Sequence, residues 1–135
     1  LGIVGMGAAA QVLMNQYGDK PTMFDYADVL FDTLPNDCEL NVIATIPVFS
    51  VHVPGVSNNA LAMLCDVNGV YVSTGSACHG HSEEPSQTLL SLGISRQDAL
   101  ETIRISPLRG MPTSQFALAC ERIRECIDHI REMQK

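Results

Sequence analysis

A polar segment in the second half of the chain most constrains how the chain can fold. It covers residues 74–86, lies between an apolar run and a helical pattern, and contains one cysteine, Cys78. Small residues precede Cys78, and the five residues after it include no large apolar side chain. Glycine and serine favour an open backbone, whereas a structural cysteine usually lies within an apolar run. The segment is therefore predicted to be an exposed loop that presents a reactive thiol.

Strand-like and helix-like patterns alternate along the rest of the chain. Alternating apolar residues predict strands at 40–44, 48–53, 70–73 and 102–106, and the strand at 70–73 is expected to be buried. Helical spacing predicts helices at 5–17, 22–34, 58–66 and 87–92, a short one after Ser95 and a long amphipathic one from Thr113. The predicted N-caps are Thr22, Ser57, Ser95 and Thr113, and the predicted C-cap is Gly18. This order predicts an α/β fold of the α+β two-layer sandwich type, in which flanking helices cover a small mixed or antiparallel sheet.

Length and charge narrow the classes of protein to which the chain can belong. The 135 residues suit a single domain, residues 1–135. A net charge of −7 argues against nucleic acid and against an anionic membrane surface as partners. No apolar run reaches the length of a membrane span and no basic segment opens the chain, so a cytoplasmic protein is predicted. A helix that starts almost at the first residue predicts that the chain was cut from a longer one.

The other cysteines and most other titratable side chains are predicted to have structural or surface roles. Five cysteines, an odd number, fit a reducing compartment. Cys65 lies in an apolar run and is a predicted core thiol. Cys120 and Cys126 are six residues apart on a predicted helix and do not share one side of it. His52 and His129 are expected to be structural or exposed, and Arg104 is expected to form a surface ion pair. Cys38 has no predicted role.

Four stretches of the chain, in order, resemble one enzyme family. Gly75-Ser76-Ala77-Cys78, followed by Glu84-Pro85-Ser86, resembles the catalytic loop of the cysteine desulfurases and selenocysteine lyases that depend on pyridoxal 5'-phosphate (PLP). These are NifS-like enzymes of the aminotransferase class V group. Residues 3–9 resemble the helix that opens their small C-terminal domain, residues 53–56 a strand end before its next helix, and residues 103–109 an arginine-bearing strand end. The resemblance covers nearly the whole chain and implies the C-terminal small domain of a fold-type I PLP enzyme.

The resemblance also implies a reaction. The enzyme, a transferase or lyase, would remove sulfur from L-cysteine, or selenium from L-selenocysteine, and leave L-alanine. Cys78 would attack the substrate sulfur and carry it as a persulfide, and Arg109 would bind the substrate carboxylate. The loop is as long as in the branch of the family that passes sulfur to a scaffold or carrier protein, as in iron–sulfur cluster assembly. Family members are usually homodimers, and an organellar location would need a targeting segment upstream.

The resemblance places the cofactor outside this chain. The family's cofactor lysine lies in a His-x-x-Lys motif, but the only lysines here are Lys20, in a predicted turn, and Lys135, at the last position. Neither fits that role, so no cofactor-binding residue is predicted in this chain. PLP would be bound by a large domain that the chain lacks, and the chain alone is expected to be inactive.

The residues around Cys78 allow more than one interpretation. His79 and His81 could lower the pKa of the thiol or relay a proton, with Ser76 as a further modulator of the loop, or they could be solvated side chains. His79 also resembles the residue after the cysteine in some selenocysteine lyases. Cys78, His79 and His81 could ligate zinc, but they lack the usual second pair of ligands, and no metal site is predicted.

Two other functions stay open beside the enzyme. The chain could be a stand-alone carrier that accepts persulfide sulfur on Cys78 without PLP chemistry of its own. It could also be a folding remnant whose former domain interface makes it self-associate.

Overall fold

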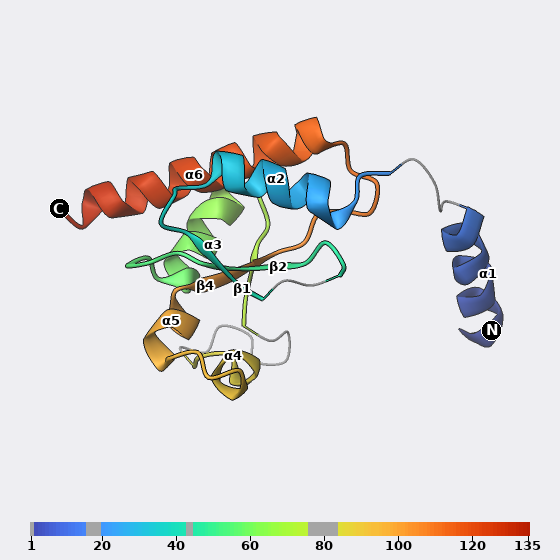
Figure 1. The fold of residues 1–135 in the computed structure, drawn as a ribbon, viewed down its shortest axis with the longest axis horizontal. Coiled ribbons are helices and arrows are strands. Elements are labelled where there is room, and N and C mark those ends of the chain that lie inside the picture. The colour runs from blue at the N-terminus through green and yellow to red at the C-terminus, as the bar shows by residue number, and fades with distance from the viewer. Residues whose placement is uncertain (1, 16–19, 43–44, 76–83) are drawn as a thin grey trace.

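The computed structural model describes residues 2–15, 20–42, 45–75 and 84–135. The helices within these ranges are α1 (Gly2–Asn15), α2 (Met23–Thr33), α3 (Asn58–Val67), α4 (Gln87–Ser91), α5 (Arg96–Leu100) and α6 (Thr113–Met133) (Figure 1). The strands are β1 (Glu39–Val42), β2 (Phe49–His52), β3 (Ser73–Thr74) and β4 (Thr102–Ile105).

The strands form one sheet in the order β1-β2-β4-β3, and every neighbouring pair is antiparallel. Helices α2 and α6 run side by side over one side of the sheet, and α3 contacts both α6 and the strands β3 and β4 (Figure 1). Helices α4 and α5 lie on the opposite side of the sheet, below it in this view. The predicted α/β fold with flanking helices is confirmed, and its sheet is antiparallel throughout.

The central strands direct alternate side chains to opposite sides of the sheet, as a pleated strand must. In β2, Phe49 and Val51 are buried, whereas Ser50 and His52 are partly exposed. Ser50 lies opposite Arg104 of β4, so the two side chains share the face that is turned away from the core. The sheet therefore has one face covered by the large helices and a second face with polar side chains.

Three aromatic rings join α2, α6 and β2 in the core. The rings of Tyr26 and Phe116 meet edge to face with their centroids 5.2 Å apart, and the ring of Phe49 lies 6.2 Å from that of Phe116. All three residues are at most 2% exposed. The hydroxyl of Tyr26 donates a hydrogen bond of 2.6 Å to the backbone oxygen of Met111, just before α6. This contact satisfies the one polar group of the cluster, which an apolar core requires.

The N-terminus of α2 is a local structure that the sequence predicts correctly. The hydroxyl of Thr22 accepts from the backbone N–H of Asp25, and the Asp25 carboxylate accepts from the backbone N–H of Thr22, which completes a capping box. The hydrogen bonds from Thr22 lower the pKa of Asp25 because they favour its charged form. Ser95 caps α5 in a similar way, by accepting from the N–H of Asp98.

Three local predictions need correction. The strand expected at 70–73 is limited to Ser73–Thr74 and is only half-buried, and Tyr71 is 81% exposed. Val70 donates its N–H to the oxygen of Cys65 at the end of α3, so the chain is still completing a helix end where the strand was expected. At α6, Pro112 takes the N-cap position that was predicted for Thr113. Ser57 does occupy the N-cap position of α3, but its side chain forms no capping bond.

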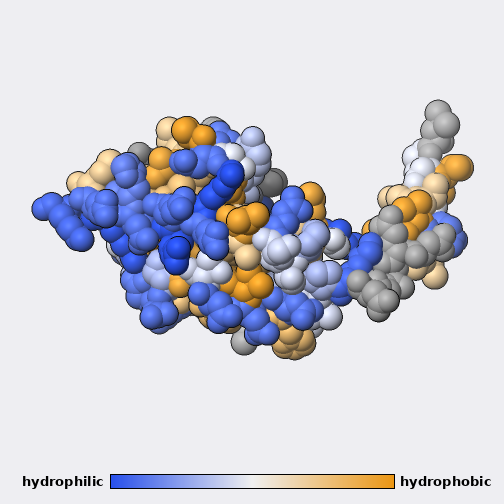
Figure 2. Space-filling view, turned by 90° about the horizontal axis from the view of Figure 1, so that it is seen from above, coloured by the Kyte–Doolittle hydropathy of each residue, from blue (hydrophilic) through white to orange (hydrophobic). Residues whose placement is uncertain are grey.

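Helix α1 stands apart from the sheet and the other helices (Figure 1). Its side chains from Gly2 to Met14 are exposed and include Ile3, Val4 and Met6. In the view from above, α1 shows apolar surface, whereas the side chains around the end of α6 are mainly hydrophilic (Figure 2). The predicted C-cap of this helix, Gly18, lies outside the described residues. None of the described helices combines the length and hydrophobicity needed to cross a membrane.

Candidate active-site cleft

An open cleft of about 330 Å³ lies between the second face of the sheet and α4. Most of its described lining is apolar or small, and Arg104 is the one charged residue among the described residues that line it. The lining residues are Val42, Ile46, Val48, Ser50, Gly75, Ser86, Thr88, Leu89, Leu92, Thr102, Ile103 and Arg104. A single cation in a mostly apolar hollow suits a small ligand that carries one anionic group.

The pairing of β3 with β4 fixes one end of the predicted cysteine loop at this cleft. Ser73 lies opposite Arg104, and the guanidinium of Arg104 donates a hydrogen bond of 3.3 Å to the backbone oxygen of Gly75. Gly75 has a φ of +63°, a left-handed conformation that residues with a side chain rarely adopt. Gly75 therefore turns the chain out of β3, three residues before Cys78 in the sequence.

The other end of the loop returns to the same place. Pro85 is buried, and Ser86 precedes the first residue of α4, where Leu89 is buried against the cleft. A Cβ atom added to Gly75 would lie 4.0 Å from the Cβ of Ser86. The two ends of the loop thus lie side by side at the cleft, as the ends of a compact functional loop do.

The structure describes some of the site residues predicted from the sequence but not others. Cys78, His79, His81 and Ser76 lie outside the described residues. Arg109 lies in the exposed segment between β4 and α6 and does not line the cleft. Arg104, which was expected in a surface ion pair, instead contacts the base of the loop. The alternating apolar pattern of residues 102–106 could not predict this contact. The contact depends on the register between β3 and β4, which the pattern of one strand does not reveal.

The four described cysteines have thiols that resist ionisation. Burial raises the pKa of Cys65 and Cys120 to about 12, and that of Cys126 is also raised by burial. Burial, with a smaller effect from the Asp37 carboxylate, raises the pKa of Cys38 to about 11. Cys65 is fully buried, as predicted for a core thiol. None of the four is therefore suited to act as a thiolate near neutral pH.

These pKa values predict that Cys78 is the thiol that native protein alkylates first. At pH 8 a thiol with the ordinary pKa is about a quarter ionised, whereas one with a pKa of 11 is about a thousandth ionised. Treating the native chain with iodoacetamide at pH 8 should add one carbamidomethyl group, and mass spectrometry of peptides should place it on Cys78. A Cys78→Ser chain should stay unlabelled over the same time. Labelling of Cys38 as fast as Cys78 would contradict this prediction.

The two lysines of this chain do not fit the role of the cofactor lysine. The cofactor needs a lysine amine, and neither Lys20 nor Lys135 lines the cleft. The Lys20 side chain packs near Gly110, since a Cβ atom added to Gly110 would lie 3.1 Å from Lys20 Cδ. Lys135 follows the end of α6.

Comparison with curated proteins gives one consistent similarity. The chain is 29% identical to a cysteine desulfurase of Frankia sp. over 99% of its own length and 34% of the relative's length. It is 31% identical to the cysteine desulfurase IscS of Shewanella frigidimarina over 97% of its own length and 33% of the relative's length. The chain thus spans about a third of the length of these relatives. No protein-family model matches the chain.

Solved structures agree with this similarity at the level of the fold. A NifS-like protein aligns with 80% of this chain and 28% of its own chain, with a TM-score of 0.63 and 23% identity. A NifS-like protein from Rickettsia africae aligns with 79% of this chain and 29% of its own, with a TM-score of 0.57 and 22% identity. The resemblance to cysteine desulfurases and the predicted fold class are confirmed.

Proposed function

We propose that this chain is the C-terminal small domain of a PLP-dependent cysteine desulfurase, because it is similar to cysteine desulfurases over almost its entire length. The single domain, residues 1–135, carries the catalytic loop at 74–86. The enzyme removes sulfur from L-cysteine and leaves L-alanine, and Cys78 accepts the sulfur as a persulfide. The observation that carries the proposal is that similarity, which covers nearly all of this chain and one contiguous third of the relatives.

The geometry of the cleft supports this role for the loop. Both ends of the loop are anchored beside an apolar hollow that contains one arginine. A loop with fixed ends can bring a thiol to a bound substrate and then turn it to another acceptor, since only its middle has to move. The four described thiols are held protonated, which leaves Cys78 as the nucleophile. His79, His81 and Ser76 are proposed to modulate its reactivity.

The rest of the site is proposed to lie outside this chain. PLP would supply the electron sink that weakens the carbon–sulfur bond of the substrate. A large domain would bind the cofactor and provide its lysine, so the chain alone is inactive. The full protein would be a homodimer that passes sulfur to a scaffold or carrier protein, for example for iron–sulfur cluster assembly. Selenocysteine is a second proposed substrate, and we also propose a cytoplasmic or organellar location.

The first test is to purify the full-length protein from its source and to assay it with L-cysteine. The proposal predicts a product about three times heavier than this chain of 14.6 kDa, with visible absorbance from a PLP Schiff base and with release of alanine. A product of 14.6 kDa without a chromophore would reject it. The carrier function would then be tested by mixing the chain with an active desulfurase and cysteine and by looking for one added sulfur atom on Cys78.

Arg104 and Arg109 are two candidates for the residue that binds the substrate carboxylate. The resemblance assigns this role to Arg109, and that assignment stays a prediction. The position of Arg104 favours the second candidate, because Arg104 lines the cleft and its bond to Gly75 uses one of five guanidinium donors.

We expect Arg104→Ala in the full-length enzyme to raise the KM for L-cysteine at least about tenfold, since a charge-assisted, bidentate contact to the carboxylate is lost. Arg104→Lys should restore only part of the affinity, because an ammonium group cannot form the fork. Arg109→Ala is the matched variant and should change KM less. The opposite ranking of the two alanine variants would return the role to Arg109. Thermal unfolding of each variant controls for a loss of loop anchoring.

A further inference from the structure

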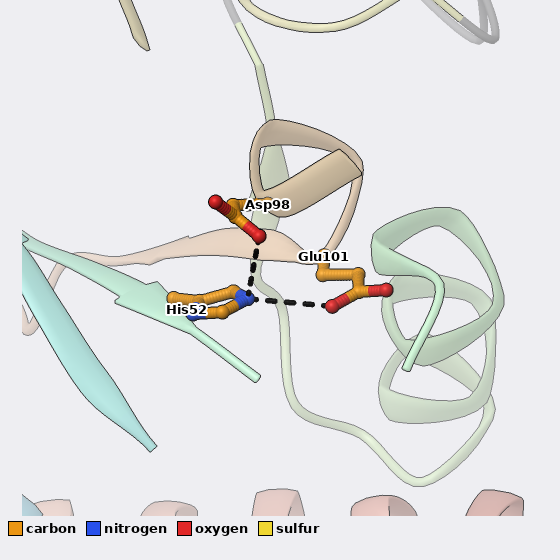
Figure 3. Close-up of side chains that lie close together, drawn as sticks. All are labelled: His52, Asp98 and Glu101. Carbon is orange, nitrogen blue, oxygen red and sulfur yellow. Dashed lines mark hydrogen bonds and ion pairs between the residues drawn. The ribbon is translucent and has the colours of Figure 1, made fainter. Parts of the chain in front are cut away.

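Three potential metal ligands from distant parts of the sequence meet next to α5. His52 ends β2, Asp98 lies in α5, and Glu101 lies between α5 and β4. The imidazole of His52 directs Nε2 toward both carboxylates (Figure 3). Nε2 lies 3.3 Å from Oε2 of Glu101 and 3.8 Å from Oδ1 of Asp98. The three donor atoms all lie within 4.8 Å of one another.

These separations fit one small cation between the three side chains. Nitrogen and oxygen ligands lie about 2.0–2.2 Å from Zn²⁺, so neighbouring donors of a tetrahedral site are about 3.3–3.6 Å apart. The distance from His52 to Glu101 is already in this range, and the distance from His52 to Asp98 exceeds it by a few tenths of an ångström. No two donor atoms lie more than 4.8 Å apart, so an ion requires them to approach by at most about 1.2 Å. The Asp98 side chain is 46% exposed, so it can rotate by that amount.

The charges of the cluster also favour a cation. Among the described residues, the ion pairs of Asp98 and Glu101 lead only to His52. Two carboxylates beside one imidazole carry a net charge of −1 if the ring is protonated and −2 if it is neutral. The side chains of His52 and Glu101 are only 15% and 12% exposed, so solvent screens this charge poorly. A divalent ion would neutralise it.

Hydrogen bonds from neighbouring residues hold the Glu101 side chain in place before any ion binds, and a backbone bond joins Glu101 to the residue after His52. The Glu101 carboxylate accepts a hydrogen bond of 2.9 Å from the N–H of Gly55 on one oxygen and a bond from the Gln97 amide on the other. The backbone oxygen of Glu101 accepts from Val53, next to His52, at 2.9 Å. Oriented ligands with hydrogen-bonded neighbours are characteristic of metal sites. They also reduce the cost of assembling the site.

We propose that His52, Asp98 and Glu101 bind a divalent transition-metal ion of the Zn²⁺ type. A neutral imidazole with two carboxylates suits Zn²⁺ and similar ions, whereas Ca²⁺ and Mg²⁺ prefer sites built of oxygen atoms. In the ion-free protein Nε2 faces two carboxylates, which only accept, so it carries a proton. On binding, that proton moves to Nδ1 by way of solvent, or is released if Nδ1 already carries one. The Nε2 lone pair then becomes a ligand, and water completes the coordination. The ion would tie α5 to the end of β2. This site is separate from the cleft and does not depend on the proposed desulfurase activity.

The test is to titrate the 135-residue chain with Co²⁺, whose visible absorption reports the type of ligand, and to compete with Zn²⁺. All samples carry Cys78→Ser, which removes the thiol most able to bind metal. We expect one Co²⁺ per chain, with no thiolate charge-transfer band, displaced by Zn²⁺ but not by Mg²⁺ or Ca²⁺. Asp98→Asn should weaken binding at least about tenfold. His129→Ala, which removes an exposed histidine of α6 outside the cluster, is the matched control and should bind as before.

The outcomes separate this proposal from a plain ion pair. Zn²⁺ should raise the unfolding temperature of the parent chain and of His129→Ala, and this shift should shrink in Asp98→Asn and in His52→Gln. Failure of the parent chain to bind Co²⁺ saturably would overturn the proposal. Binding that is unchanged by Asp98→Asn and His52→Gln, or that is lost in His129→Ala, would overturn it too. Because the Asp98 side chain is half-exposed, the Asp98→Asn chain is expected to fold. Its unfolding temperature, measured without metal and compared with that of the parent chain, checks this.

Discussion

Replacing Cys78 by alanine in the full-length protein is expected to lower the release of alanine from L-cysteine at least about a thousandfold, as removal of an enzyme nucleophile does. Without the thiol, the substrate sulfur has no acceptor. The PLP absorbance should stay unchanged, because the residues that bind the cofactor are proposed to lie elsewhere. Alanine formation and the visible spectrum of the same sample measure the two effects.

The matched control for this experiment is Cys38→Ala. Cys38 is half-buried at the edge of the core, and its pKa of about 11 keeps it protonated. Its removal should leave the rate within about twofold of the parent, since a substitution away from the reacting groups has a small effect. Full activity of the Cys78→Ala enzyme would reject the proposed nucleophile. An equal loss in both variants would show that damage to the fold, and not to the chemistry, explains the result.

Replacing Phe116 by alanine is expected to lower the free energy of unfolding of the chain by about 3–5 kcal/mol, the usual cost of deleting a buried ring. Phe116 is 2% exposed and contacts the rings of Tyr26 and Phe49, so its loss opens a cavity where α2, α6 and β2 meet. Because domains are usually stable by only about 5–15 kcal/mol, this is a large part of the total. Urea unfolding followed by circular dichroism measures the change.

Leu118 provides the comparison on the same helix. It is 60% exposed, so Leu118→Ala should change the free energy of unfolding by no more than about 0.5 kcal/mol. Phe116→Leu should recover part of the loss, because it fills some of the cavity. A cost for Phe116→Ala as small as that for Leu118→Ala would show that the aromatic cluster does not hold the two layers together.

The link between sequence and fold is clearest where interactions are local. The helix from Met23 to Thr33 follows from apolar spacing and from the N-cap at Thr22, and both were predicted from the sequence. The apolar side of α6 was predicted from the same spacing, and Phe116 and Ile123 on it are buried. The strand at 70–73 was wrong, because the turn that ends α3 competes for the same residues, and hydrophobicity alone does not reveal this competition.

The residues of the candidate site also differ in whether the sequence or only the tertiary structure points to them. Cys78 was predicted from the sequence, because a thiol in a polar, small-residue loop differs from its neighbours, and the resemblance gave it a role. It stays a prediction, because it lies outside the described residues. Arg104 was given a surface role, because nothing near it in the sequence points to Gly75. Only the antiparallel pairing of β3 with β4 brings the guanidinium to the base of the loop.

The sequence by itself determined the order of elements, the helix caps at Thr22 and Ser95, and the similarity to cysteine desulfurases. These features depend on residues that lie within one or two turns of one another. Only the tertiary structure decided that Arg104 lines the cleft and that His52 meets Glu101, 49 positions further along the chain. Such contacts depend on strand register and helix packing, which are set by the folded core as a whole.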